Sequence, residues 1–219
     1  VYHFSTTSTD ESSKWLVRLS KFRISYLPVF STFLAQEERR TPAVIEDALV
    51  RGHVNSVIRN LLLDIKLQER EQELIEVLNH VFPGLEDLSI DFNKDTDRYI
   101  AVTYKEEGRT KAFDLFSAGS GFQQFVYLFG FVALRQPDVI LLDEPDVHLY
   151  GTLQRALLSE LRRVVSEGKQ VLFATHSPDL ISQMSPSEII ALDRSKAARL
   201  QIASEVYDVL DNLGSLDVS

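Results

Sequence analysis

Two adjacent carboxylates follow a run of apolar residues in the second half of the chain. The run 139–142 leads directly into Asp143 and Glu144, and Pro145 comes next. Because continuous apolar runs are typical of buried parallel strands, both acids are expected at the carboxyl end of a strand, where α/β sheets bind ligands. There Asp143 could hold Mg²⁺, and Glu144 could orient or deprotonate a water that attacks a phosphoryl group. The alternative is a strand end with two solvated acids, but the flanking run and the proline favour the functional interpretation.

A histidine follows the next apolar run in the same way. The run 171–174 is followed by Thr175 and His176, and then Ser177 and Pro178 form a typical helix start. This order predicts that His176 reaches the same edge of the sheet as the two acids. A histidine beside a phosphate can donate a hydrogen bond that senses the γ-phosphate and holds the attacking water. Taken alone, a capped loop histidine would be the better interpretation; beside Asp143 and Glu144, the catalytic one is favoured.

A third candidate is a turn of small residues before an amphipathic helix. Its residues are Ser117, Ala118, Gly119, Ser120 and Gly121. Small residues let backbone N–H groups approach an anion, and a helix N-terminus adds about half a positive charge. The segment therefore predicts a phosphate-binding turn, although a serine and glycine turn by itself is more often a loop and cap.

The second half of the chain alternates between helix and strand patterns. The predicted elements are helix Ser120–Arg135, strand Val139–Leu142, helix Thr152–Glu167, strand Gln170–Ala174, short helix Pro178–Gln183 and strand Glu188–Leu192. This order predicts an α/β fold in which helices cover both faces of a parallel sheet. We expect the acidic end of the chain, with Asp208, Asp211 and Asp217, to be a linker.

The first half of the chain has a different pattern. It predicts a loop at Phe4–Ser13, a strand at Phe22–Leu27, a two-part helix that starts at Pro42 and breaks near Gly52, and a helix from Gln68 to Phe82. Three short alternating runs, Leu88–Phe92, Tyr99–Tyr104 and Lys111–Leu115, then predict a small antiparallel meander.

The composition limits the classes of function. With 44% hydrophobic and 25% charged residues the chain is expected to fold. Its net charge of −9 argues mildly against binding of nucleic acid, although a local basic face is still possible. The absence of cysteine excludes disulfides and thiolate zinc sites. The longest apolar stretch, 125–134, is far shorter than the roughly 18 residues of a membrane-spanning helix. We therefore expect a cytoplasmic protein with no membrane contact.

Taken in order, the segments 117–120, 143–144 and 176 resemble the second half of an ABC-type ATPase. They match its signature motif, its Walker B motif with the catalytic glutamate, and its switch histidine. Within that class, the residues of 120–124, 143–149 and 174–177 are more similar to the RecF-like and overcoming-lysogenization-defect (OLD) branch of AAA-type prokaryotic ATPases than to transporters.

The resemblance implies ATP and Mg²⁺ as cofactors, with Glu144 and His176 catalytic and Asp143 at the metal. It also implies that residues 117–121 contact ATP and that two copies of the protein form a homodimer around the nucleotide. The implied roles are DNA repair and phage defence, with DNA or a nuclease domain as a partner. The implied architecture is a linking segment over 1–115, with a strand, a helical arm and the meander, followed by the second half of the ATPase core over 116–219.

The chain also departs from the pattern of the class. Only the serine and one glycine of Leu-Ser-Gly-Gly-Gln are kept in 116–120, and Tyr150 stands where many ABC proteins carry the D-loop aspartate. No Gly-x-x-x-x-Gly-Lys-Ser/Thr is present, and Gly168-Lys169 lies in a predicted helix-to-strand turn without the hydroxyl residue. We expect the phosphate loop to lie upstream of Val1 and the chain to be inactive without it.

Three functions from different classes remain after these observations. The first is an ATP-hydrolysing switch of RecF or OLD type. The second is the nucleotide-binding subunit of a transporter, which would be expected to show a fuller signature and the D-loop aspartate. The third is a non-catalytic interaction module, against which the intact Asp143, Glu144 and His176 argue.

Overall fold

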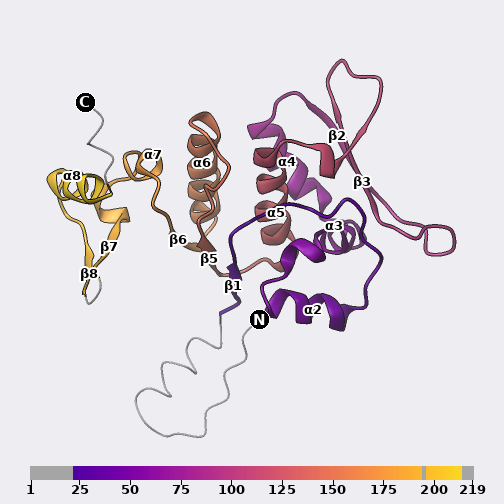
Figure 1. The fold of residues 1–219 in the computed structure, drawn as a ribbon, viewed down its shortest axis with the longest axis horizontal. Coiled ribbons are helices and arrows are strands. Elements are labelled where there is room, and N and C mark those ends of the chain that lie inside the picture. Colours follow the sequence, from indigo (N-terminus) through magenta and orange to yellow (C-terminus); the bar gives the residue numbers. More distant parts are fainter. Residues whose placement is uncertain (1–21, 194–195, 214–219) are drawn as a thin grey trace, which may run out of the picture.

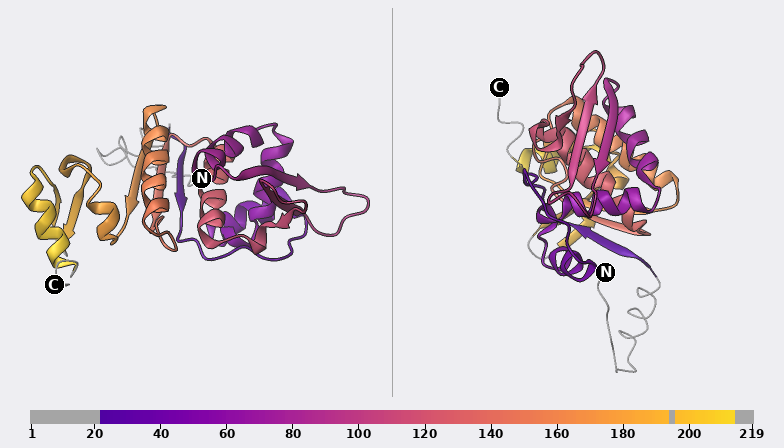
Figure 2. Two further views of the ribbon diagram at one scale, coloured as in Figure 1. Left: turned by 90° about the horizontal axis from the view of Figure 1, so that it is seen from above. Right: turned by 90° about the vertical axis from the view of Figure 1, so that its right-hand side faces the viewer.

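The computed structural model describes residues 22–193 and 196–213, so the loop expected at Phe4–Ser13 lies outside the described residues. In Figure 1 a small group formed by α7, α8, β7 and β8 lies at the left. The parallel sheet and α6 lie in the middle, and α2–α5 lie at the right with the β2–β3 ribbon. The left view of Figure 2 shows the same order of these groups from above. The expected class, an α/β fold with a parallel sheet flanked by helices, is confirmed.

The parallel sheet has three strands in the order β1-β5-β6. These are β1 (Ile24–Leu27), β5 (Val139–Asp143) and β6 (Gln170–Ala174). Leu27 lies opposite Leu142, and Asp143 lies opposite Ala174. All three strands therefore end at one edge. The sequence predicted each strand, but it did not predict that β1, from the first half of the chain, pairs with β5.

Helix α5 (Ser120–Arg135) has the bounds that the sequence predicted and is buried along most of its length. It packs against α3 (Ile58–Leu67) and α4 (Glu71–Val81) on the side away from the sheet. Helix α6 (Thr152–Ser166) connects β5 to β6. The predicted break near Gly52 is confirmed, because α2 (Pro42–Val50) ends there and a short 3₁₀ turn, η1 (Val54–Ser56), separates it from α3. Gly52 has a φ of 75°, a backbone conformation that favours glycine.

The predicted meander is also confirmed. Strands β2 (Leu85–Asp91), β3 (Ala101–Glu106) and β4 (Phe113–Asp114) pair antiparallel in this order. The first strand begins three residues earlier than predicted, because Leu85 pairs with Glu106 across an irregularity in the register. A second 3₁₀ turn, η2 (Leu115–Ser117), joins the meander to α5.

Two expectations for the C-terminal part were wrong. Strand β7 (Ile190–Asp193) does not extend the parallel sheet but pairs antiparallel with β8 (Lys196–Arg199). Only two residues separate these strands, and a connection that short permits only antiparallel pairing. Asp208 and Asp211 lie in helix α8 (Ala203–Asn212) rather than in a linker, whereas Asp217 lies outside the described residues.

The buried side chains form two clusters. The larger one joins both halves of the chain, from Leu27 on β1 to Val164 on α6. The smaller one lies among α7 (Pro178–Ile181), the 3₁₀ turn η3 (Pro186–Glu188), the β7–β8 pair and α8. Coverage of the sheet is uneven, since Ile140 is fully buried but Leu172 on β6 is 50% exposed. Helices thus cover β6 less completely than its apolar sequence predicted. No helix in the described ranges is long and apolar enough to cross a membrane.

Candidate functional site

The carboxyl edge of the parallel sheet brings together three of the predicted site residues. Asp143 is the last residue of β5, and the backbone N–H of Glu144 donates to the carbonyl of Ala174 at 3.0 Å, one step beyond the paired strands. His176 follows the end of β6 by two residues. The two apolar runs therefore place Asp143, Glu144 and His176 at one edge, as the sequence predicted.

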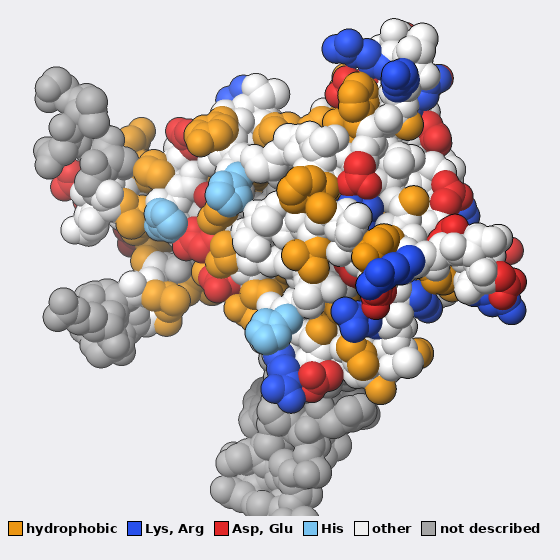
Figure 3. Space-filling model, turned by 45° about the vertical axis from the view of Figure 1, so that its right-hand side comes forward, with side chains coloured by type: hydrophobic (Ala, Val, Ile, Leu, Met, Phe, Trp, Pro, Cys, Tyr) orange, Lys and Arg blue, Asp and Glu red, His pale blue; other side chains and the backbone are white. Residues whose placement is uncertain are grey.

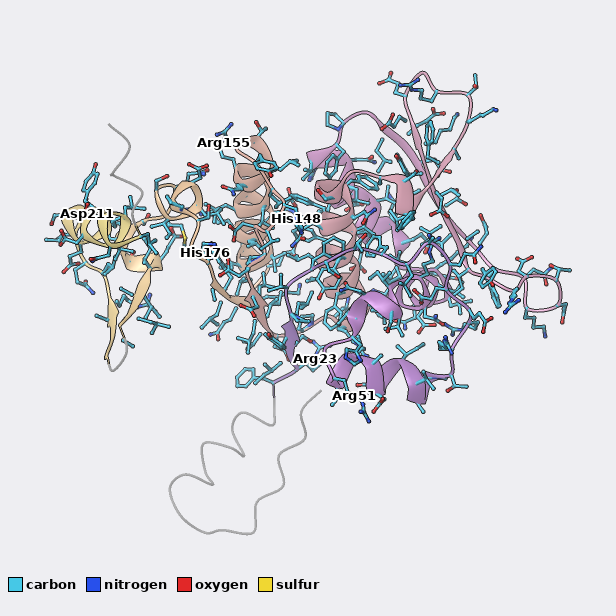
Figure 4. All side chains as sticks on the ribbon, in the orientation of Figure 1. Arg23, Arg51, His148, Arg155, His176 and Asp211 are labelled. Carbon is cyan, nitrogen blue, oxygen red and sulfur yellow. The ribbon has the colours of Figure 1, made fainter. Side chains whose placement is uncertain are left out.

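Glu144 contacts His176 directly. The imidazole Nδ1 lies 2.8 Å from each carboxylate oxygen, but only Oε1 has the geometry of a hydrogen bond. Oε2 is buried and has no hydrogen-bond partner in the structure. Figure 4 labels His176 beyond the end of β6, close to the loop that follows β5. Both carboxylate oxygens of Glu144 therefore lie at contact distance from the imidazole.

The backbone after β5 is unusual. Glu144 has a φ of 45° and His148 a φ of 66°, and Gly151 follows with a φ of 39°. A left-handed backbone is unfavourable for residues other than glycine, and such residues cluster at functional sites. The turn at Glu144 ends the strand and accompanies the contact between its carboxylate and His176. Figure 3 shows histidine side chains exposed on this face of the molecule, with acidic side chains near them and elsewhere on the face.

The charges at this edge affect one another. The hydrogen bond to Glu144, followed by the negative charges of Glu144 and Asp146, raises the pKa of His176, whose side chain is 75% exposed. Burial raises the pKa of Asp146, the nearby charge of Glu144 adds to this, and the hydrogen bond from Thr175 opposes it. The site thus favours a protonated imidazole beside Glu144.

A polar clamp joins the loops after β5 and β6. The Thr175 hydroxyl donates to Oδ1 of the buried Asp146 at 2.8 Å, and it accepts from the backbone N–H of Ser177 at 3.0 Å. Gln154 on α6 adds a second link, because its amide accepts from the Ser177 hydroxyl and donates to the carbonyl of Leu149. These bonds fix the spacing between the loops that carry Glu144 and His176.

The sequence interpretation gave no role to Asp146, Thr175 or Tyr26. The Tyr26 hydroxyl on β1 donates to Oδ2 of Asp143 at 3.3 Å. Asp146 and Thr175 could have been found from their positions in the sequence. Asp146 lies two residues after Glu144, and Thr175 directly precedes His176. No sequence signal pointed to Tyr26, because its contact depends on the pairing of β1 with β5.

Asp143 fits the role of a Mg²⁺ ligand in the manner of phosphoryl-transfer sites. Within the described residues, no three His, Asp or Glu side chains converge as a metal cage would require. Mg²⁺ in such sites instead keeps several waters and uses one or two carboxylates together with substrate phosphates. Asp143 supplies one such carboxylate at the end of β5.

The predicted phosphate-binding turn lies at the start of α5. Gly119 is the residue before the helix and has no side chain to cap the first amides, and Ser117, Gly119 and Ser120 are exposed. An uncapped helix N-terminus with exposed amides fits an anion. Ala118 is half-buried beneath this surface.

This turn adjoins the carboxyl edge but does not merge with it. No hydrogen bond or ion pair within the described part of the chain joins residues 117–121 to Asp143, Glu144 or His176. The connection is indirect: the side-chain amide of Gln124 on α5 donates to the carbonyl of Pro145 at 3.0 Å, and a Cβ added at Gly121 would lie 2.6 Å from Cδ1 of Leu153. The structure therefore contains two separate groups of candidate residues.

Two further sequence interpretations can be compared with the structure. Gly168-Lys169 lies in the turn between α6 and β6 as predicted, and Lys169 pairs with Glu167 at 3.2 Å. Tyr150, which stands where the D-loop aspartate is expected, is 84% exposed. Neither residue contacts the Glu144–His176 pair.

The parallel sheet, the paired acids at its edge and the histidine of the next strand define an ATP-binding domain of the ABC and AAA ATPase class. Residues 2–182 match the protein family described as "AAA domain, putative AbiEii toxin, Type IV TA system". This match covers most of the chain. The protein therefore belongs to this family of AAA domains.

One curated relative and two solved structures extend the comparison. A "Putative ABC transporter ATP-binding protein" of Methanosarcina acetivorans is 34% identical over 85 residues, which are 39% of this chain and 30% of the relative. A structure described under "ATP-driven dimerization and DNA stimulated activation of SMC ATPases" has a TM-score of 0.53 and 12% identity, and the match covers 71% of this chain and 97% of that one. The Smc head domain of Pyrococcus yayanosii has a TM-score of 0.50 and 14% identity, with coverage of 80% and 33%. At these identities the structures show a shared fold.

Proposed function

We propose that this chain supplies residues that hydrolyse ATP in an ATP-driven switch protein of the RecF-like and OLD type. The observation that carries the proposal is the contact of Glu144 with His176 beside Asp143 at the carboxyl edge of the parallel sheet. An acid that can accept a proton, next to a histidine that can contact a phosphate, is the arrangement that ATP hydrolysis requires.

Each side chain has a distinct part in this proposal. Glu144 orients the attacking water and accepts its proton through its carboxylate, and its side chain is 23% exposed. Because Nδ1 of His176 is bound to Glu144, Nε2 is the nitrogen that donates to the γ-phosphate. Asp143 would hold Mg²⁺, which would neutralise the charge that develops on the phosphate oxygens. The hydrogen bond from Thr175 to Asp146 holds the two loops at a fixed spacing.

The turn 117–121 acts, in this proposal, on ATP held by a second copy of the protein. Within the described residues no hydrogen bond or ion pair joins it to Glu144, so the proposal assigns it to the nucleotide of the other subunit. The amides at the start of α5 would stabilise negative charge on the phosphates from the opposite side. The description of the SMC neighbour refers to ATP-driven dimerization, which is consistent with a homodimer formed around the nucleotide.

The proposal for the biological role rests on the descriptions of the family and of the SMC neighbour. The family description names a toxin of a type IV toxin–antitoxin system, and the SMC neighbour is described as DNA-stimulated. Both are consistent with a cytoplasmic role in phage defence or DNA repair, in which DNA or a nuclease domain is the partner.

A transporter subunit is the second candidate, and the name of the archaeal relative favours it. The altered signature in 116–120 and the exposed Tyr150 argue against it. A non-catalytic module, the third candidate, would not need the contact of Glu144 with His176 beside Asp143.

Glu144→Gln in the full-length protein tests the proposal. The amide keeps the size of the side chain but cannot accept the proton, so kcat should fall on the order of 10²-fold or more while Mg-ATP still binds. Steady-state hydrolysis and fluorescence titration with labelled ATP measure the two quantities. Asp143→Asn should instead weaken the binding that depends on Mg²⁺.

Glu160→Gln is the matched control, because Glu160 is a buried glutamate on α6 that pairs with Arg163 outside the site. It should leave kcat within about twofold of the wild-type value. Hydrolysis by Glu144→Gln at the wild-type rate would show that Glu144 is not the base.

A further inference from the structure

Arg59 on α3 is among the largest side chains that the fold buries completely, with 1% of its surface exposed. Its guanidinium forms two bonds to the carboxylate of Asp114, from Nη2 to Oδ1 at 2.6 Å and from Nη1 to Oδ2 at 3.2 Å. It also donates to the carbonyls of Leu34 and Ile100. A buried charge with this many partners is strongly destabilised when one partner is removed.

Asp114 holds the turn that leads to the predicted phosphate-binding residues. Its Oδ1 accepts from the backbone N–H of Phe116 at 2.8 Å and so caps the turn η2. Its carbonyl accepts from the hydroxyl of Ser117 at 2.7 Å. The carboxylate that binds Arg59 therefore also fixes the backbone from which Ser117 projects.

The other end of the network lies at Glu37, in the loop between β1 and α2. Oε2 of the buried Glu37 accepts from the backbone N–H of Arg59 at 3.0 Å, and its Oε1 accepts from both the backbone and the side chain of Asn60. The path from Glu37 through α3 to Asp114 is thus a continuous chain of hydrogen bonds. It joins the loop before α2 and helix α3 to the turn η2 that precedes α5.

We propose that Arg59 is a positioning residue for the turn 117–121, and that it couples this turn to α3. The inference rests on the proposed function, in which the turn contacts ATP held by a second copy. Loss of the Arg59–Asp114 pair would release the cap on η2 and let Ser117 and the first amides of α5 move. If Arg59 only filled the core, a folded Arg59→Met protein would dimerise at the same concentration as its parent.

The test uses full-length protein that carries Glu144→Gln, in which bound ATP is not consumed. Arg59→Met or Asp114→Asn is added, and Mg-ATP binding to the monomer and ATP-dependent dimerisation are measured by fluorescence titration and analytical ultracentrifugation. Asp114→Asn keeps an oxygen for the N–H of Phe116 but loses the charge that pairs with Arg59. The control is Ile65→Val, a mild truncation of a fully buried residue on the same helix.

We expect both variants to need an about tenfold or higher protein concentration for half-dimerisation, while Mg-ATP binding to the monomer stays within about twofold. Arg59→Lys should restore part of the dimerisation, and Ile65→Val should change neither quantity. Unchanged dimerisation in Asp114→Asn, or in a folded Arg59→Met, would overturn the inference. Failure of the Glu144→Gln parent to dimerise with ATP would instead contradict the proposed function, and the inference with it.

Discussion

Glu144 and His176 share one hydrogen bond, so the protonation of either residue affects the other. The carboxylate raises the pKa of the imidazole above its ordinary value of 6.5. Because the imidazole is largely exposed, it can still exchange protons with solvent and turn toward a ligand. The pair can therefore hold the histidine in its charged form until a phosphate arrives.

The titration of His176 tests this coupling. The pKa of His176 should lie above 6.5 in the wild-type protein and fall toward 6.5 in Glu144→Gln, because the amide carries no charge to stabilise the imidazolium. NMR titration of ¹³C-labelled histidine, with the signal assigned from a His176→Gln sample, measures the shift.

The raised pKa of His176 also determines how its contribution to the stability of the fold depends on pH. A folded-state pKa above the unfolded value means that the pair stabilises the fold below pH 6.5, and that this contribution is lost as pH rises through the folded-state pKa. Equal titration of His176 in the wild-type and Glu144→Gln proteins would contradict the contact.

The site residues differ in how far the sequence could predict them. Asp143, Glu144 and His176 could be placed at one edge because each follows a continuous apolar run, and such runs indicate parallel strands. Their chemical roles remain predictions. Tyr26 and Arg59 could not be found in the same way, because their contacts depend on which strand and which turn fold against them.

At the scale of elements, the start of α5 is held close to α6 by a glycine. A Cβ at Gly121 would lie 2.6 Å from Cδ1 of Leu153, closer than side chains approach one another. The absence of a side chain there lets the predicted phosphate-binding turn lie against the loop that follows β5.

Gly121→Ala should therefore lower the free energy of unfolding by about 1 kcal/mol, since the strain of overpacking exceeds the gain in helix propensity. Urea unfolding followed by circular dichroism measures the change. Gly119→Ala is the matched control two residues away, because nothing lies within 4 Å of its added Cβ.

A double variant separates the clash from other effects of the alanine. In a Leu153→Ala background the methyl group at position 121 has space, so Gly121→Ala should no longer destabilise the protein. The same loss of stability in both backgrounds would show that Leu153 does not cause it.

The elements also show where sequence reasoning ends. The bounds of α5 were predicted correctly, because a turn of small residues precedes its apolar repeat. The pairings of β1 with β5 and of β7 with β8 were not predicted, because strand order is set by packing between distant segments. The division into a linking segment over 1–115 and a core over 116–219 stays a prediction. The pairing of β1 shows only that the first of these segments contributes a strand to the sheet.

At the scale of the whole molecule, the separation of the two groups of candidate residues predicts shared sites. If the turn 117–121 of one subunit completes the site of the other, two inactive variants should complement each other. Ser117→Arg places a bulky cation in the turn, and Glu144→Gln removes the base. In their mixed dimer one site receives Glu144 and an intact Ser117, while the other site receives both changes. Steady-state hydrolysis should therefore appear on mixing two full-length proteins that are each inactive.

The reverse pairing distinguishes sites shared between subunits from sites that lie within one subunit. A dimer of wild type with the Ser117→Arg/Glu144→Gln double variant has one change in each site if the sites are shared, so it should not hydrolyse ATP. If both residues acted within one subunit, the wild-type subunit would keep a whole site, and hydrolysis would continue at about half the wild-type rate. Differential affinity tags isolate the mixed dimer before the assay. Hydrolysis by that purified dimer would exclude a role for Ser117 in the partner's site, because each shared site would then contain a residue that cannot support the reaction.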